Sequence, residues 1–155
     1  MKTVMTTLLG GTLLAVSLTA AAQLSPEEQI ETRKAGFTYM AWNMGKIKAQ
    51  VIDESVEYNP EQVSAAAQTI AAIANSGMGA LFGPGTDHDV GDQATRADPA
   101  LFDNMNDMAE LAGNLGTASD NLVTAAATGD PSAVRAAFGE VGKSCKACHD
   151  KYRLD

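Results

Sequence analysis

Apolar residues recur at steps of three and four along much of this 155-residue chain, which is the period of an amphipathic helix. The clearest series consists of Ile30, Arg33, Phe37, Met40, Met44, Ile47 and Val51. Arg33 is its only charged member. Because a helix buries such a stripe, we expect these side chains to face a core, with one charge set into it.

Three further segments have the same periodicity. The second has Val63, Ala67, Ile70 and Ala74; the third has Phe102, Met105, Ala109, Ala112 and Leu122; the fourth has Val134, Phe138, Val141, Cys145, Cys148 and Tyr152. No strand pattern and no internal repeat stands out. The patterning therefore indicates an all-α chain with four core-facing helices.

Proline positions predict where these helices begin. Four of the five prolines directly follow a good N-cap residue, in the pairs Ser25-Pro26, Asn59-Pro60, Asp98-Pro99 and Asp130-Pro131. Ser25 with Glu28 also forms a capping box. We predict helices over about 26–53, 60–75, 99–128 and 131–154. The first and third connections are short, which favours antiparallel neighbours and an up-down-up-down four-helix bundle.

The second connection, about 76–97, is much longer and contains the run Phe82-Gly83-Pro84-Gly85-Thr86. A loop of this length is either functional or a disordered surface segment. In an up-down-up-down bundle it lies at the end where the first helix begins and the fourth finishes. At 1.5 Å per residue, Arg33 and His149 both lie roughly 10 Å from that end. We therefore expect this loop, Arg33, Phe37 and the Cys145–His149 segment to converge there.

The first 22 residues are typical of a secretory signal peptide. Lys2 supplies the charged region, Met5 to Leu18 the apolar region, and Ala20-Ala21-Ala22 a small-residue cleavage site. An uncleaved membrane anchor is the alternative, but the apolar run is shorter than the roughly 20 residues that a span needs. We predict cleavage before Gln23, a mature single domain over 23–155, and a periplasmic location.

The charge balance limits the partners. The formal net charge is −8, and removing Lys2 with the leader makes it more negative. This argues against binding to nucleic acid or to an anionic membrane surface. It permits a basic redox partner, whose identity the sequence does not give.

The strongest chemical signal is Cys145-Lys146-Ala147-Cys148-His149. Cys-x-x-Cys-His is the attachment signature of a c-type haem. On a helix the three side chains share one face, so both thiols can form thioethers while His149 offers a nitrogen to iron. We therefore expect one haem c, bound through Cys145 and Cys148, with His149 as metal ligand.

Other uses of the motif fit less well. A zinc site needs four ligands, and His88 is the only other histidine in a chain with no other cysteine. A thioredoxin-like redox pair should follow a strand in a βαβ unit. A disulfide across one helical turn would leave His149 without a role.

Taken together, these residues resemble the cytochromes c′, the class II c-type cytochromes. Cys145 to Arg153 reads C-K-A-C-H-D-K-Y-R, similar to the family pattern C-x-x-C-H-x-x-Y-[RK], and Ala80 to Thr86 looks like the family loop between the second and third helices. The resemblance implies a four-helix bundle, often a homodimer, with a pentacoordinate iron that binds nitric oxide or carbon monoxide. The spacing after the loop departs from the family, so its acidic haem contact stays open among Asp87, Asp89 and Asp92.

Several side chains are further candidates for the haem site. The resemblance places Arg33 near the haem propionates, although a snorkelling arginine would also fit. Lys34 is a second candidate beside it. Arg153 lies four residues after His149, as a haem contact or as a cation at a helix C-terminus. His88, among aspartates, is expected to be solvated, and Tyr39 with Trp42 offers a homodimer contact.

The distal side of the iron separates three possible functions. Phe37, one turn beyond Arg33, should cover the distal face. A phenyl ring cannot ligate iron, which predicts a pentacoordinate, high-spin iron that takes up small gases, passes single electrons, or does both. The alternative is a six-coordinate, low-spin electron carrier that uses Met40 or Met44. An enzyme such as a peroxidase would need a polar distal pair where the stripe is apolar, so we expect no enzymatic activity.

Overall fold

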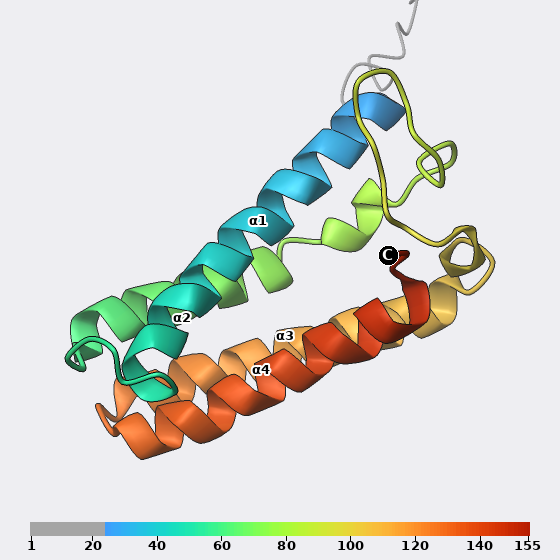
Figure 1. Ribbon diagram of the computed structural model, residues 1–155. Helices are drawn as coiled ribbons and strands as arrows, with labels where there is room; N and C mark the ends of the chain where they lie inside the picture. Colours follow the sequence, from blue (N-terminus) through green and yellow to red (C-terminus); the bar gives the residue numbers. More distant parts are fainter. Residues whose placement is uncertain (1–23) are drawn as a thin grey trace, which may run out of the picture.

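The computed structural model describes residues 24–155, so the predicted leader over 1–22 lies outside the described residues. Four α-helices follow one another: α1 (Pro26–Val51), α2 (Pro60–Ala74), α3 (Met105–Ala127) and α4 (Pro131–Tyr152). Two short 3₁₀ helices, η1 (Met78–Leu81) and η2 (Pro99–Leu101), lie between α2 and α3. Within this part of the chain the fold is the expected all-α four-helix bundle (Figure 1).

Three of the four predicted helix starts are confirmed by their capping hydrogen bonds. Glu28 N–H donates to the Ser25 hydroxyl, and the Glu28 carboxylate accepts from Ser25 N–H at 2.8 Å. Asn59 Oδ1 accepts from the Gln62 amide at 2.9 Å, and Asp130 Oδ1 accepts from the Ser132 amide at 2.8 Å. Each cap satisfies a donor that the first helical turn leaves free.

The predicted start of the third helix is wrong. Asp98 does cap a helical turn, accepting from the Ala100 amide at 2.8 Å, but this turn is η2 and lasts three residues. The chain then bends, and α3 begins only at Met105. Leu101 is buried in a small apolar cluster at this bend. Because the helix restarts after the bend, α3 buries a different set of side chains from the predicted stripe. Met105, Ala109 and Ala112 of the predicted stripe are exposed, whereas Met108 is buried and Leu122 remains in the core.

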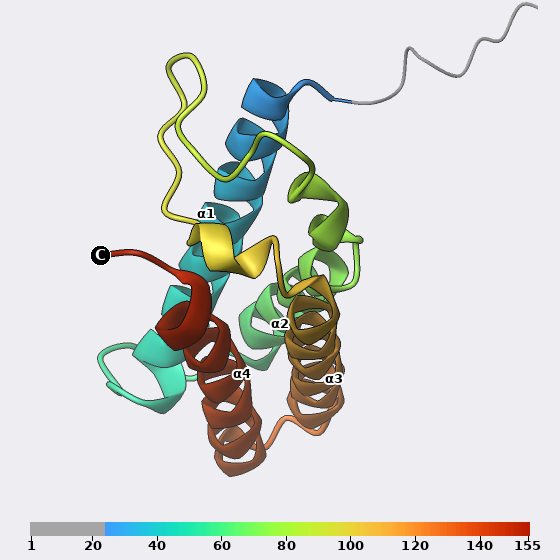
Figure 2. The ribbon, with the colours of Figure 1, turned by 90° about the vertical axis from the view of Figure 1, so that its right-hand side faces the viewer.

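Successive helices run antiparallel, and the main core lies between them (Figures 1 and 2). Its buried members are Met40, Ile47, Val51, Val63, Ala66, Ala67, Ile70, Ala118, Leu122, Ala126, Val134 and Val141. Most of the apolar stripes predicted for the first, second and fourth helices are thus confirmed. Phe37 is the exception on α1, because 39% of it is exposed.

A second, smaller apolar cluster lies at the other end of the bundle, away from the short connections between α1 and α2 and between α3 and α4. Leu101, Met108 and Tyr152 are its buried members, with Phe82, Phe102, Leu111 and Cys148 packed against them. The cluster joins η2, α3 and the end of α4.

The long segment between α2 and α3, which we call the crossover (residues 75–104), is ordered and spans this end of the bundle (Figure 2). Val90 and Gln93 pair across a tight turn, and the Asp98 amide donates to Tyr152 O at 2.9 Å. The Leu154 amide donates to Arg96 O at 2.8 Å. The crossover and the C-terminal residues therefore meet at this end as predicted, and Arg33 joins them through hydrogen bonds to Leu81, Thr86 and Thr95.

The helices described here include none with the length and apolar character that a membrane span requires.

Candidate functional site at the crossover end of the bundle

The three motif residues lie on the last two turns of α4, at the boundary between the core and solvent. Cys145 is half-buried and packs against the main core, while Cys148 is half-buried against the small cluster. Both thiols are free. His149 is exposed. The helical spacing places the three side chains on one face, as predicted.

The surroundings of the motif shift the titration of all three groups. Burial raises the pKa of the Cys145 thiol, and the neighbouring Cys148 raises it further. Burial, and then the charge of Asp107, raises the pKa of Cys148. Burial lowers the pKa of His149, with further lowering by the charges of Arg153 and Arg96. A neutral imidazole keeps the lone pair that metal ligation requires.

This set of donors fits haem c. Two free thiols stand one turn apart beside apolar side chains of two clusters, and an imidazole follows the second thiol directly. The thiols can each add to one vinyl group, and the clusters supply apolar surface for the macrocycle. When bound, the haem supplies an iron that takes up a neutral gas or an electron.

Arg33 is 3% exposed and ties α1 to the crossover. Its Nη1 donates to Leu81 O at 3.2 Å and to the Thr86 hydroxyl at 2.9 Å. Its Nη2 donates to Thr86 O at 2.7 Å and to the Thr95 hydroxyl at 2.5 Å. The guanidinium also lies 4.6 Å from the centre of the Phe82 ring.

These bonds use four of the five N–H groups of the guanidinium. Desolvation by burial lowers the pKa of Arg33, while the four acceptors satisfy its donors. A contact with a haem propionate stays a prediction, and it would use the remaining Nε–H or displace one of these partners.

The other predicted contacts lie on the same end of the molecule. Lys34 is exposed and its Nζ donates to Gln93 Oε1 at 3.2 Å. Phe37 is one turn further along α1 and partly exposed. Arg153 Nη1 lies 3.4 Å from His149 Nδ1. The roles of all three toward the haem stay predictions.

The contact between Arg153 and His149 depends on the imidazole tautomer. A guanidinium can only donate, so it bonds Nδ1 only when that nitrogen carries no proton. When Nε2 ligates a metal in a neutral imidazole, Nδ1 carries the proton. Arg153 then contributes its positive charge beside the ring rather than a hydrogen bond.

The three acidic candidates after the Gly-Pro-Gly run have different local partners. Asp89 Oδ1 accepts from the Thr95 amide at 2.8 Å. Asp87 Oδ1 lies 2.9 Å from exposed His88 Nδ1, and this hydrogen bond lowers the pKa of Asp87. The Asp92 amide donates to Glu27 Oε1 at 3.2 Å. Of the three carboxylates, that of Asp89 ties two parts of the crossover together, and the acidic haem contact among the three stays a prediction.

A glycine allows the crossover to lie close to α1. Gln29 Oε1 accepts from the Gly83 amide at 3.1 Å. A Cβ atom at position 83 would lie 2.5 Å from that oxygen, so any other residue would push the side chain of Gln29 away. The Gly83-Pro84-Gly85 run is therefore a point of close approach between crossover and helix.

Sequence reasoning missed three polar residues that organise this end. Thr86 is fully buried and accepts from Arg33, and Thr95 accepts from both Arg33 and the Ala97 amide. Asp107 accepts from Tyr152 and Lys151. Thr86 belongs to the Phe82–Thr86 run that the sequence singled out, although no role was predicted for it. No local pattern pointed to Thr95 or Asp107, because their partners are distant in sequence.

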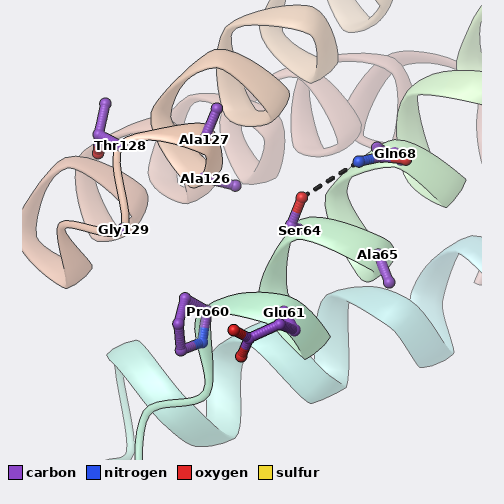
Figure 3. Close-up of a pocket in the computed structure, with 9 residues that line it drawn as sticks. All are labelled: Pro60, Glu61, Ser64, Ala65, Gln68, Ala126, Ala127, Thr128 and Gly129. Carbon is purple, nitrogen blue, oxygen red and sulfur yellow. Dashed lines mark hydrogen bonds between the residues drawn. The ribbon is translucent and has the colours of Figure 1, made fainter.

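Two surface depressions flank the bundle. A polar one surrounds His149 and is lined by Arg96, Lys146, His149, Asp150, Arg153, Leu154 and Asp155. The other lies at the opposite end, between the start of α2 and the end of α3 (Figure 3). Ser64 and Gln68 are hydrogen-bonded to each other there, and no predicted site residue lines it.

Comparison with known proteins agrees with these features. The family model described as Cytochrome C′ matches residues 28–153. The chain is 59% identical to cytochrome c′ of Allochromatium vinosum over 133 residues, which is 86% of this chain and 84% of that protein. The crystal structure of cytochrome c′ from Thermochromatium tepidum, 63% identical, superposes with a TM-score of 0.82 and covers 86% of this chain and 100% of its own.

Other solved relatives carry functional descriptions. A cytochrome c′ with ligand-controlled dimer dissociation is 58% identical, with a TM-score of 0.82, over 86% of this chain and 100% of its own. Mutants of cytochrome c′ from Alcaligenes xylosoxidans have been solved with nitric oxide and with carbon monoxide; both are 31% identical, with TM-scores of 0.73, and cover 84% of this chain and 97% and 98% of their own. On the motif, the bundle and these matches, the chain belongs to the cytochrome c′ family and is a haem c protein.

Proposed function

We propose that this protein is a periplasmic haem protein that binds nitric oxide or carbon monoxide at an open iron site. His149 is the only protein ligand of the iron, Cys145 and Cys148 hold the haem, and Phe37 covers the distal face. The domain is the mature chain from 23 to 155, after cleavage of the leader. Binding, rather than catalysis, is the function that this site serves.

The observation that carries the proposal is the position of the methionines on α1. Met40 is 3% exposed and belongs to the main core, and Met44 packs against the same cluster. A thioether that fills the core has to leave it before it can ligate iron, which costs about 2–5 kcal/mol for a buried methionine. This supports the high-spin reading over the alternative electron carrier with a Met40 or Met44 ligand.

Relatives support gas binding as the function of the open site. Nitric oxide and carbon monoxide complexes exist for the Alcaligenes xylosoxidans protein. In this chain, Phe37 offers a ring with no lone pair, so it admits a small neutral ligand without competing for the iron.

The test is the visible spectrum of the purified protein, ferric and ferrous, with and without each gas. We expect a high-spin ferrous spectrum that changes on adding nitric oxide or carbon monoxide. A methionine–iron charge-transfer band in the ferric protein, with no response to carbon monoxide, would favour the electron carrier instead.

Two variants identify the ligand if such a band appears. Met40→Leu and Met44→Leu each remove one of the two candidate thioethers of α1. Under our proposal both variants keep the high-spin spectrum of the parent protein.

We further propose a homodimer through the exposed aromatic pair of α1. Tyr39 and Trp42 are 52% and 54% exposed, their ring centres are 5.3 Å apart, and Lys46 Nζ lies 3.4 Å from the Trp42 ring centre. Such a patch is of the kind that oligomer interfaces cover. The relative with ligand-controlled dimer dissociation supports this arrangement.

Single-electron transfer to a redox partner is a compatible second role of the same haem.

Export is tested by separating periplasmic and cytoplasmic fractions and determining the N-terminus of the mature chain. Recovery of the protein in the cytoplasm, with Met1 retained, would refute the periplasmic assignment.

A further inference from the structure

Thr95 lies at a junction between α1, the crossover and the end of α4. Its hydroxyl oxygen accepts from Arg33 Nη2 at 2.5 Å and from the Ala97 amide at 3.2 Å. Its own amide donates to Asp89 Oδ1 at 2.8 Å. The Thr95 side chain thus binds both the buried guanidinium of Arg33 and the backbone amide of Ala97.

The residues that follow Thr95 pair with the residues that follow His149. Ala97 and Arg153 form an antiparallel bridge, flanked by the bonds from Asp98 N–H to Tyr152 O and from Leu154 N–H to Arg96 O. The Arg96 side chain adds a bond from Nε to Leu154 O at 2.9 Å. The backbone of Arg153 is therefore held by the crossover and not by α4 alone.

Arg153 in turn places a positive charge beside the imidazole of His149. Its Nη1 lies 3.4 Å from His149 Nδ1, four residues back on the same helix. A continuous series of contacts therefore leads from Arg33 through Thr95 and the paired segments to His149.

We propose that Thr95 is a positioning residue of the haem site: it fixes the segment 96–98, which holds Arg153 and keeps its charge beside His149. The proposal rests on His149 being the iron ligand, as argued above. It gives the crossover a second role besides covering the end of the bundle, because it connects α1, which carries Phe37, to the end of α4, which carries His149. Contiguity alone does not establish energetic coupling, so the test must measure it.

Thr95→Val in the haem-loaded protein removes the shared acceptor with little change of shape. We expect amide hydrogen exchange at Asp98 and Leu154 to become about fivefold faster, since one hydrogen bond is lost from the segment that they anchor. We also expect the reduction potential of the haem to fall. A nearby positive charge favours the ferrous form, which carries one positive charge less, and a looser segment lets Arg153 move away.

Two matched variants complete the experiment. Thr95→Ser keeps the hydroxyl and should restore both the exchange rates and the potential. Thr69→Val makes the same threonine-to-valine change on α2, where the Thr69 hydroxyl donates to Ala65 O and touches neither Arg33 nor the crossover, and it should leave both readouts at the parent values.

The proposal is overturned if Thr95→Val changes neither readout, or if Thr69→Val produces the same changes. Faster exchange with an unchanged potential would also overturn it, because Thr95 would then act only on the stability of the crossover. Neither readout uses a gas ligand, so a failure of gas binding would leave this test intact.

Discussion

Tyr152 donates a 2.5 Å hydrogen bond from its phenol to Asp107 Oδ2, which joins the last turn of α4 to the first turn of α3. Lys151 donates to both oxygens of the same carboxylate at 2.8 Å. Tyr152 itself is buried in the small cluster beside Cys148. The turn that carries His149 is therefore held from the α3 side by Asp107.

Asp107→Asn should destabilise the folded protein in a pH-dependent manner. Hydrogen bonds from Lys151, and then from Tyr152, hold the pKa of Asp107 below its ordinary value. Its ionised form therefore stabilises the fold above the ordinary aspartate pKa, and this contribution disappears as the pH falls through the lower folded value. We expect the variant to unfold at lower denaturant than the parent at pH 7, and the difference to shrink as the pH falls below the ordinary aspartate pKa.

Asp103→Asn is the control for this measurement, because Asp103 is exposed and lies just before α3. Equal pH dependence in both variants would mean that Asp107 contributes only as part of the net charge.

Each cysteine of the motif should be required for full covalent attachment. Two thioethers keep the haem on the polypeptide through acid–acetone extraction. Cys148→Ala leaves one thioether at most, so we expect maturation to be weakened or abolished, with a lower yield of haem-loaded protein. Extraction of free haem from the parent protein would contradict covalent attachment altogether.

Phe37→Ala should speed gas binding. The ring is 39% exposed on α1, where it is expected to obstruct the distal side. Removing it should raise the association rate of carbon monoxide by about tenfold or more, equivalent to about 1.4 kcal/mol of barrier. Phe37→Met should instead supply a thioether and move the spectrum toward six-coordinate, low-spin iron.

Leu24→Ala is a matched control for this substitution, since Leu24 is 40% exposed and precedes α1. It should leave the rates of gas binding unchanged. Unchanged rates in Phe37→Ala as well would show that the ring does not obstruct the site.

Trp42→Ala should weaken the proposed homodimer. An exposed tryptophan in contact with Tyr39 and Lys46 is typical of an interface anchor, and truncating such anchors commonly costs about 2 kcal/mol or more. We expect the dimer dissociation constant, measured by sedimentation, to rise at least about thirtyfold. Val56→Ala is the comparison, because Val56 is equally exposed but lies in the loop after α1. A parent protein that is monomeric at micromolar concentration would exclude this interface.

Local chemistry explains which helices could be predicted from the sequence. The caps at Ser25, Asn59 and Asp130 act within three residues, so each pattern is complete in a short window. Asp98-Pro99 carries the same local signal, but burial of Leu101 beside Met108 and Tyr152 ends the turn early. Those partners lie elsewhere in the chain, and a local pattern contains no information about them.

The same limit applies to the site. The spacing of Cys145, Cys148 and His149 specifies the haem chemistry on its own. Arg33 was placed at the correct end of the bundle, but its four acceptors lie 48 to 62 residues further along the chain. Its tie to Thr95 required the three-dimensional arrangement of the crossover.

The unequal connections of the bundle have a consequence for the order in which it assembles. Residues 128–130 join α3 to α4 directly, whereas the crossover closes over about thirty residues and is fixed by contacts as distant as Arg33 with Thr95. Closing a longer loop costs more chain entropy, and distant contacts tend to form later. We therefore expect the end with the short turns to pair first. The Cys-x-x-Cys-His turn would then stay accessible to the attachment machinery until the crossover settles over it.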